Sequence, residues 1–183
     1  MYLSGLKKIA TLLSLILICL QLAHAGSAQK TAESDTTIEN AILVHINQYR
    51  QLHGLNPLKM DSRIVLEAKR HSADMAHHKL PFGHKYFNNR IDRLHRQIKE
   101  SNAGAENVAF NYKDAEDVVK NWLRSPGHKR NIDGNYNLTG IGIARDAHGK
   151  MYFTQIFLKT GSHNKYSTRH PKSALFNIFK KLG

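Results

Sequence analysis

Apolar residues recur at intervals of three and four in several stretches of the chain, a spacing that places them on one face of a helix. The first stretch opens with the capping-box pair Thr36 and Glu39 and is followed by Gly54, which suits a left-handed C-cap. Asp61 is placed to cap a second helix. That helix is predicted to end at residues 80–84, where a proline and a glycine both resist continuation of a helix.

The second half of the chain changes from helical spacing to the pattern of a β-hairpin. A third helix is predicted at about residues 89–100, and Asp114 opens a fourth, which is followed by a Ser-Pro-Gly-His turn. Residues 140–144 and 151–158 predict two strands around a turn at 146–149, because they are rich in β-branched and aromatic residues. Helices followed by a late hairpin predict an α+β fold, with a long loop between the third and fourth helices.

The N-terminal 25 residues have the features of a secretory signal peptide. Lys7 and Lys8 precede an apolar run at residues 9–22, and Ala23-His-Ala25 provides the small residues that a signal peptidase accepts. An uncleaved membrane anchor is the alternative, although the run is shorter than the roughly 20 apolar residues of a membrane span. The chain is therefore divided into a signal peptide (1–25), a flexible lead-in (26–35), one domain (36–161) and a tail (162–183).

Cleavage of this peptide changes the composition in two ways. It removes the only cysteine, so the predicted mature domain has no disulfide and depends on its hydrophobic core. It removes two lysines and no acidic residue, which lowers the net charge from +13 only to +11. Such a charge favours an anionic membrane or cell-wall polymer, or else provides only solubility and weak adhesion. No recognised nucleic-acid module accompanies the charge, so specific nucleic-acid binding is not expected.

The predicted tail combines apolar and basic residues. On a helix, Phe176 and Phe179 would share a broad apolar face close to Lys180 and Lys181. This arrangement suits the interface of an anionic membrane. The alternatives are a terminal helix packed on its own domain and a disordered end.

Several short motifs occur together in the predicted domain. A Ser-Pro-Gly sequence precedes His128, an Ala-Glu106-Asn-Val sequence lies before the fourth helix, and His84 follows the second helix. Together with Asn-Gln-Tyr-Arg at residues 47–50 and the closing strand at 152–157, these motifs resemble the CAP superfamily of cysteine-rich secretory, antigen 5 and pathogenesis-related 1 proteins. A predicted mature chain without cysteine is similar to the bacterial branch of that superfamily.

The resemblance implies a three-layer α-β-α sandwich with a small antiparallel sheet, and a cleft lined by functional side chains. His84, Glu106 and His128 match the family's cleft positions. Asn107 and Trp122 are expected to have structural roles.

One position departs from the family's pattern. The resemblance places a second cleft glutamate two residues before the tryptophan, where this chain has Lys120. Glu116 lies one helical turn earlier on the same face and could partly substitute, although its carboxylate would be displaced by about 6 Å.

The cleft residues suggest a metal site. Two imidazoles and a carboxylate are a ligand set for zinc, with water in the fourth position. His84 and His128 are therefore predicted metal ligands, and Zn²⁺ or another divalent cation is a candidate cofactor. The alternative for Glu106 is a structural role, in which its carboxylate accepts hydrogen bonds that fix the long loop.

Three functions are left open. The first is an exported, monomeric domain, periplasmic or extracellular, that binds a divalent metal or a small or lipid ligand in the His/Glu cleft and an anionic envelope component on its basic surface. The second is a metal-assisted, peptidase-like hydrolase of extracellular or cell-envelope substrates, which requires an acid or base beside an open metal position. The third is a non-catalytic scaffold that uses the tail. Lys120 in place of an acid favours binding over catalysis.

Overall fold

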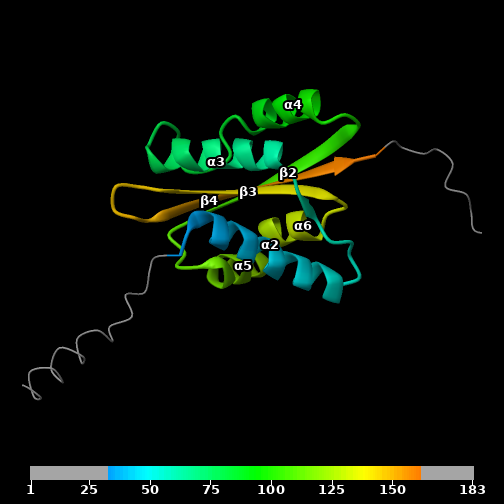
Figure 1. Ribbon diagram of the computed structural model, residues 1–183, viewed down its shortest axis with the longest axis horizontal. Helices are drawn as coiled ribbons and strands as arrows, with labels where there is room; N and C mark the ends of the chain where they lie inside the picture. Colours follow the sequence, from blue (N-terminus) through cyan, green and yellow to red (C-terminus); the bar gives the residue numbers. More distant parts are fainter. Residues whose placement is uncertain (1–32, 162–183) are drawn as a thin grey trace, which may run out of the picture. The chain divides into compact units, whose positions relative to one another are not determined.

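Four strands form a sheet between two layers of helices in the computed structural model of the chain, which describes residues 33–161 (Figure 1). The predicted signal peptide, most of the lead-in and the predicted tail lie outside the described residues. In chain order the elements are α2 (Asp35–Leu52), β1 (Lys59–Met60), α3 (Ser62–Ala76), α4 (Phe87–Gln97), β2 (Ser101–Phe110), α5 (Ala115–Arg124), α6 (Pro126–Asp133), β3 (Leu138–Arg145) and β4 (Met151–Thr160).

The strands are ordered β1-β3-β4-β2 across the sheet. β3 and β4 form the predicted antiparallel hairpin, and β4 also pairs antiparallel with β2. β1 runs parallel to β3, with Lys59 opposite Leu138 and Met60 opposite Thr139. The small sheet predicted to be antiparallel is therefore mixed. Parallel pairing needs a long crossover connection, and the chain between β1 and β3 provides one through four helices and a strand.

Two elements differ from the sequence-based prediction. β2 occupies the segment predicted as a long loop, and its residues 105–109 are all buried. A strand covered on both faces lacks the alternation of apolar and polar residues that marks a half-buried strand. The Ser-Pro-Gly-His segment, predicted as a turn, begins helix α6, with Ser125 as the N-cap and Pro126 in the first turn. Proline suits that position because its missing N–H would have no partner within the helix.

The helices cover the two faces of the sheet (Figure 1). α3 and α4 lie on one face, where Leu94 and Ile156 belong to the core. α2, α5 and α6 lie on the other, where Trp122 and Phe153 are buried. This arrangement confirms the α+β class and the three-layer α-β-α sandwich. Between residues 33 and 161, no helix is long and apolar enough to cross a membrane.

Two glycines in β3 allow α3 to pack directly on the sheet. Gly140 and Gly142 are two residues apart and so lie on the same face of the strand. A Cβ atom at Gly140 would collide with the α3 backbone at Ile64 and Val65, and one at Gly142 would collide with the backbone of the next turn of that helix. The repeated glycine therefore sets the distance between helix and sheet.

Replacing Gly142 with alanine is expected to destabilise the domain by about 1–3 kcal/mol, as overpacking does, because the α3 backbone must move to admit the methyl group. Gly127→Ala is the matched control, since a Cβ there meets nothing within 4 Å and lies in helix α6. Urea unfolding of both variants measures the difference. Equal stability of the two variants would contradict the close approach of α3 to β3.

Candidate functional site

A cleft of about 700 Å³ lies between the loop that follows α3, the end of β2 and the start of α6. His84 and His128 both line it, so the structure brings the two predicted histidines to one site. Aromatic side chains form much of the rest of the wall, namely Phe82, Phe110, Tyr112 and Trp122. His84 also borders a neighbouring hollow of about 330 Å³, which Glu106 lines.

Glu106 is held in a buried ion pair. It lies in β2, and only 1% of its side chain is exposed. Arg90 of α4 donates from Nε to Oε2 at 2.9 Å and from Nη2 to Oε1 at 2.8 Å, which makes the pair bidentate. His84 Nδ1 lies 3.0 Å from the same Oε1. Because an ionised carboxylate can only accept, Nδ1 carries the proton, and in the neutral ring Nε2 is left as an acceptor.

The environment of Glu106 keeps its carboxyl group ionised. Burial alone would raise the pKa of this carboxyl, but the hydrogen bonds from His84 and Arg90, together with the Arg90 charge, outweigh burial and lower the pKa below its ordinary value. A carboxylate with a lowered pKa and both oxygens occupied is a weak base. Glu106 is therefore better suited to orient the His84 ring than to act as a base that removes a proton from a substrate.

Arg90 also fixes the loop that carries His84. Its guanidinium is buried, and Nη1 donates to the carbonyl oxygen of Lys85 at 2.8 Å. Arg90 is not recognisable as a site residue from the sequence, because a basic residue in an amphipathic helix usually belongs to the solvated face. No local signal in the sequence indicates that its partner is a glutamate in the following strand.

His71 supports the same loop from beneath. Its side chain is fully buried, and Nε2 lies 2.8 Å from the carbonyl oxygen of Gly83, to which it donates. Nε2 is also 3.9 Å from Glu106 Oε1. Among the described residues Nδ1 has no hydrogen-bond partner. Burial lowers the pKa of His71, so the ring is neutral in the folded state near pH 7.

His128 lies in the first turn of α6 and is half-buried. Burial, and secondarily the neighbouring charge of His84, lowers its pKa. The backbone carbonyl of His128 accepts a hydrogen bond from Asn107 Nδ2 at 3.2 Å, and Asn131 Nδ2 donates to Asn107 Oδ1 at 2.8 Å. The buried amide of Asn107 thus ties β2 to α6.

Trp122 forms the floor of the cleft. Its side chain is 1% exposed, and Nε1 donates to the carbonyl oxygen of Val108 at 3.4 Å. Its ring centroid is 6.4 Å from that of His128. The tryptophan therefore packs α5 against β2 and lies beside one of the candidate ligand-binding histidines.

The structure does not bring Glu116 to this cleft. Glu116 and Lys120 line a separate surface depression of about 410 Å³, together with His45. The exposed face of α5 that carries them points away from β2, whereas the buried face carries Trp122. Lys120 therefore does not replace an acid in this cleft, and the identity of residue 120 carries no weight in the choice between binding and catalysis.

The residues at the cleft fit a metal site only in part. Among residues 33–161, no group of three or more histidine, cysteine, aspartate or glutamate side chains is placed to hold a metal ion. The two oxygens of Glu106 already accept from Arg90 and His84. His84 Nε2 and the His128 imidazole are left as potential ligands, so a zinc ion would need water or a bound ligand to complete its four positions.

The chain belongs to the CAP family, since the family model of the Cysteine-rich secretory protein family matches residues 43–157. Two relatives from Bacillus subtilis (strain 168) are similar in sequence. The uncharacterized membrane protein YlbC is 34% identical over 138 residues, and the uncharacterized protein YkwD is 32% identical over 146 residues. These matches cover 74% and 73% of this chain but 38% and 56% of the relatives, so the chain spans only part of their length.

Solved structures show the same fold. An outer surface protein of Borrelia burgdorferi has a TM-score of 0.62 and 21% identity, covering 70% of this chain and 97% of that one. A cysteine-rich secretory protein of Staphylococcus aureus has a TM-score of 0.59 and 22% identity, and the match covers 70% of this chain and 40% of that one. An extracellular protein of Bacillus anthracis with an SCP domain has a TM-score of 0.55 and 25% identity, and the match covers 73% of this chain and 45% of that one. These three proteins are described as an outer surface protein, a cysteine-rich secretory protein and an extracellular protein.

Arg90→Met is expected to destabilise the domain by about 3–5 kcal/mol, because it leaves the Glu106 charge buried without its main partner. Lys129→Met is the control, since it breaks an ion pair with Asp133 in which both side chains are partly exposed. Urea unfolding monitored by circular dichroism measures both variants. A loss as small for Arg90→Met as for Lys129→Met would show that the buried pair is not needed for stability.

The free energy of unfolding is expected to fall as the pH drops below 6.5. The unfolded chain takes up a proton at His71 near the ordinary value of 6.5, whereas burial lowers the pKa of His71 in the folded state. His71→Gln removes this contribution, so its stability should change less between about pH 7.5 and pH 5.5. His128, whose pKa is also lowered by burial, should add a dependence of the same sign. Urea unfolding across this range tests the expectation, which identical pH profiles of wild type and variant would contradict.

Proposed function

We propose that this chain is an exported CAP domain whose cleft binds a small amphipathic molecule, with an apolar body and a polar or anionic end. The composition of the cleft carries the proposal. Phe82, Phe110 and Trp122 offer an apolar wall. His84 and His128 offer imidazole groups at the same cleft, and no carboxylate is found among the described residues that line it.

The geometry favours binding over hydrolysis. A metal-assisted hydrolase needs an acid or base beside the reacting group. Glu106 is the acid next to His84, but its carboxylate is buried and accepts from Arg90 and His84. Its lowered pKa further reduces its basicity. These features support a role in which Glu106 positions His84 for a ligand.

A transition metal at the two histidines is the second candidate, and one contact favours it. Metal-bound histidines commonly donate their other ring N–H to a carboxylate, which orients the ring. The hydrogen bond from His84 Nδ1 to Glu106 has this form and leaves Nε2 available. His84 and His128 would hold the ion, and the ion would supply a Lewis-acid centre for the polar end of a ligand.

Two further points remain part of the proposal. The net charge of +13 supports association with an anionic membrane or cell-wall polymer. The outer-surface and extracellular relatives support a location outside the cytoplasm. The scaffold alternative depends on residues 162–183, with Phe176, Phe179, Lys180 and Lys181, which lie outside the described residues.

The lone tryptophan makes the cleft directly observable, because Trp122 lines it. A medium-chain fatty acid, which has an apolar body and a carboxylate, is expected to change Trp122 emission in a saturable titration. Loss of saturable binding in His84→Ala/His128→Ala is the expected result. The same substitutions at His77 and His148, which are exposed and do not line the cleft, should leave the titration unchanged. Equal binding by both double variants would contradict the assigned site.

A zinc titration of the same proteins separates the second candidate. Zinc at about 100 times its Kd should stabilise the folded state by about 2.7 kcal/mol, or roughly 5–10 °C in Tm for a domain of this size. A shift that is lost only in His84→Ala/His128→Ala supports the metal site. A shift of equal size in that variant assigns zinc to other histidines, and no shift in the wild type rejects zinc at the cleft.

A further inference from the structure

Three aromatic side chains form a cluster at the outer end of the cleft. The Phe82 ring centroid lies 6.2 Å from that of Phe110 and 6.5 Å from that of Tyr152, and the Phe110 and Tyr152 centroids are 4.7 Å apart. Tyr152 is buried, but Phe82 is 55% exposed and Phe110 is 37% exposed. Two large apolar rings are therefore presented together to solvent, held in place by a buried third.

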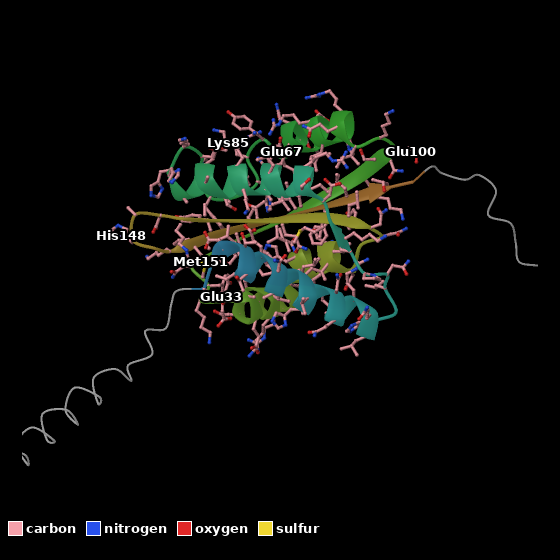
Figure 2. All side chains as sticks on the ribbon, in the orientation of Figure 1. Glu33, Glu67, Lys85, Glu100, His148 and Met151 are labelled. Carbon is pink, nitrogen blue, oxygen red and sulfur yellow. The ribbon has the colours of Figure 1, made fainter. Side chains whose placement is uncertain are left out.

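Lysines accompany these rings. Lys150 Nζ lies 5.7 Å from the centroid of the Phe110 ring. Lys79 precedes Phe82 by three residues and Lys113 follows Phe110 by three, and both lysines are exposed. Figure 1 shows the loop after α3 and the β3–β4 hairpin at the same end of the sheet, and Figure 2 places His148 at the tip of that hairpin.

Two acids of this end, Asp114 and Asp146, are engaged within their own turns. Asp114 caps α5 by accepting from the backbone N–H of Asp117. Asp146 accepts from the backbone N–H groups of His148 and Lys150. Lys113 Nζ is 3.8 Å from Asp114, but the lysine side chain is 79% exposed. Lys79, Lys113 and Lys150 thus place exposed positive charge near the apolar rings.

We propose that this end of the domain, the cleft rim formed by Phe82, Phe110, Lys79, Lys113 and Lys150, docks on an anionic lipid bilayer. Aromatic rings enter the boundary between headgroups and acyl chains, and lysines around them bind the lipid phosphates. The inference rests on the proposed function and extends it. Because Phe82 and Phe110 also line the cleft, docking brings the cleft opening to the membrane, so a ligand with an apolar body passes between the two without crossing water.

Sedimentation with vesicles of phosphatidylglycerol and phosphatidylcholine tests the proposal, using purified proteins with identical termini. Phe82→Ser/Phe110→Ser is expected to weaken binding at least tenfold, because both apolar anchors are lost. Leu52→Ser is the apolar control. Leu52 is 85% exposed at the C-terminal end of α2, which lies away from the hairpin in Figure 1. Circular dichroism confirms that each variant is folded.

Charge variants test the contribution of the lysines to vesicle binding. Replacing Lys79, Lys113 and Lys150 with glutamine is expected to weaken binding by about a hundredfold, since each lysine at an anionic surface contributes roughly fivefold. Lys59, Arg96 and Lys99 are exposed elsewhere on the domain, so their replacement with glutamine removes the same net charge without touching the rim. Equal weakening by both triple variants would mean that net charge alone drives association, and would overturn the proposal.

A tryptophan at Phe82 reports directly on contact with the bilayer. The emission that Phe82→Trp adds to that of Trp122 in the wild type is expected to shift to the blue with anionic vesicles and to be quenched by brominated lipids. Unchanged emission during vesicle binding would place the rim away from the bilayer and overturn the proposal. Vesicle binding by Phe82→Ser/Phe110→Ser that equals binding by the wild type would also overturn it. The proposal would also be overturned if the rim bound a protein partner but the domain did not bind vesicles. His84→Ala/His128→Ala should bind vesicles like the wild type, so failure of the cleft assignment is recognised separately.

Discussion

The buried carboxylate of Glu106 is the interaction on which the cleft depends. It joins three parts of the chain, because β2 carries it, α4 provides Arg90, and the loop after α3 provides His84. Asn131 of α6 also donates to the backbone oxygen of Glu106 at 3.1 Å. A buried charge is costly unless it is paired and hydrogen-bonded, so the carboxylate strongly favours the one arrangement that brings these groups together. The orientation of the His84 ring is therefore fixed by the buried Glu106 carboxylate as well as by the loop that carries His84.

A second buried charge organises the opposite face of the sheet. The side chain of Arg50, at the end of α2, is 1% exposed. Its Nε donates to the carbonyl oxygen of Asn56 at 2.8 Å, and its Nη atoms donate to carbonyl oxygens that follow α6, at Gly134 and Tyr136. Carbonyl groups at the C-terminal end of a helix lack helical partners and attract positive charge. Arg50 thus fixes the end of α6, and the start of that helix carries His128.

Residue patterns predict the elements that local composition or capping residues mark, and miss those that lack such marks. The cap at Asp61 and the β3–β4 hairpin follow from the sequence because local residues determine them. β2 has no such signal, since Val108 is its only β-branched residue and its polar residues pair with distant groups. His84, Glu106 and His128 are found because short motifs mark them. Arg90 and His71 are not, because their roles arise only when α3, α4 and β2 pack together.

The placement of α5 explains why no free acid is found among the described residues of the cleft. The face of this helix that meets β2 carries Trp122, and its charged residues Glu116 and Lys120 lie at a different depression. The remaining carboxylate, Glu106, is directed to Arg90. Imidazoles at one part of the cleft and aromatic rings at its outer end support the proposed ligand, which has distinct polar and apolar ends. Phe82 and Phe110 belong both to the cleft and to the exposed rim, so any surface that covers the rim also controls entry to the cleft.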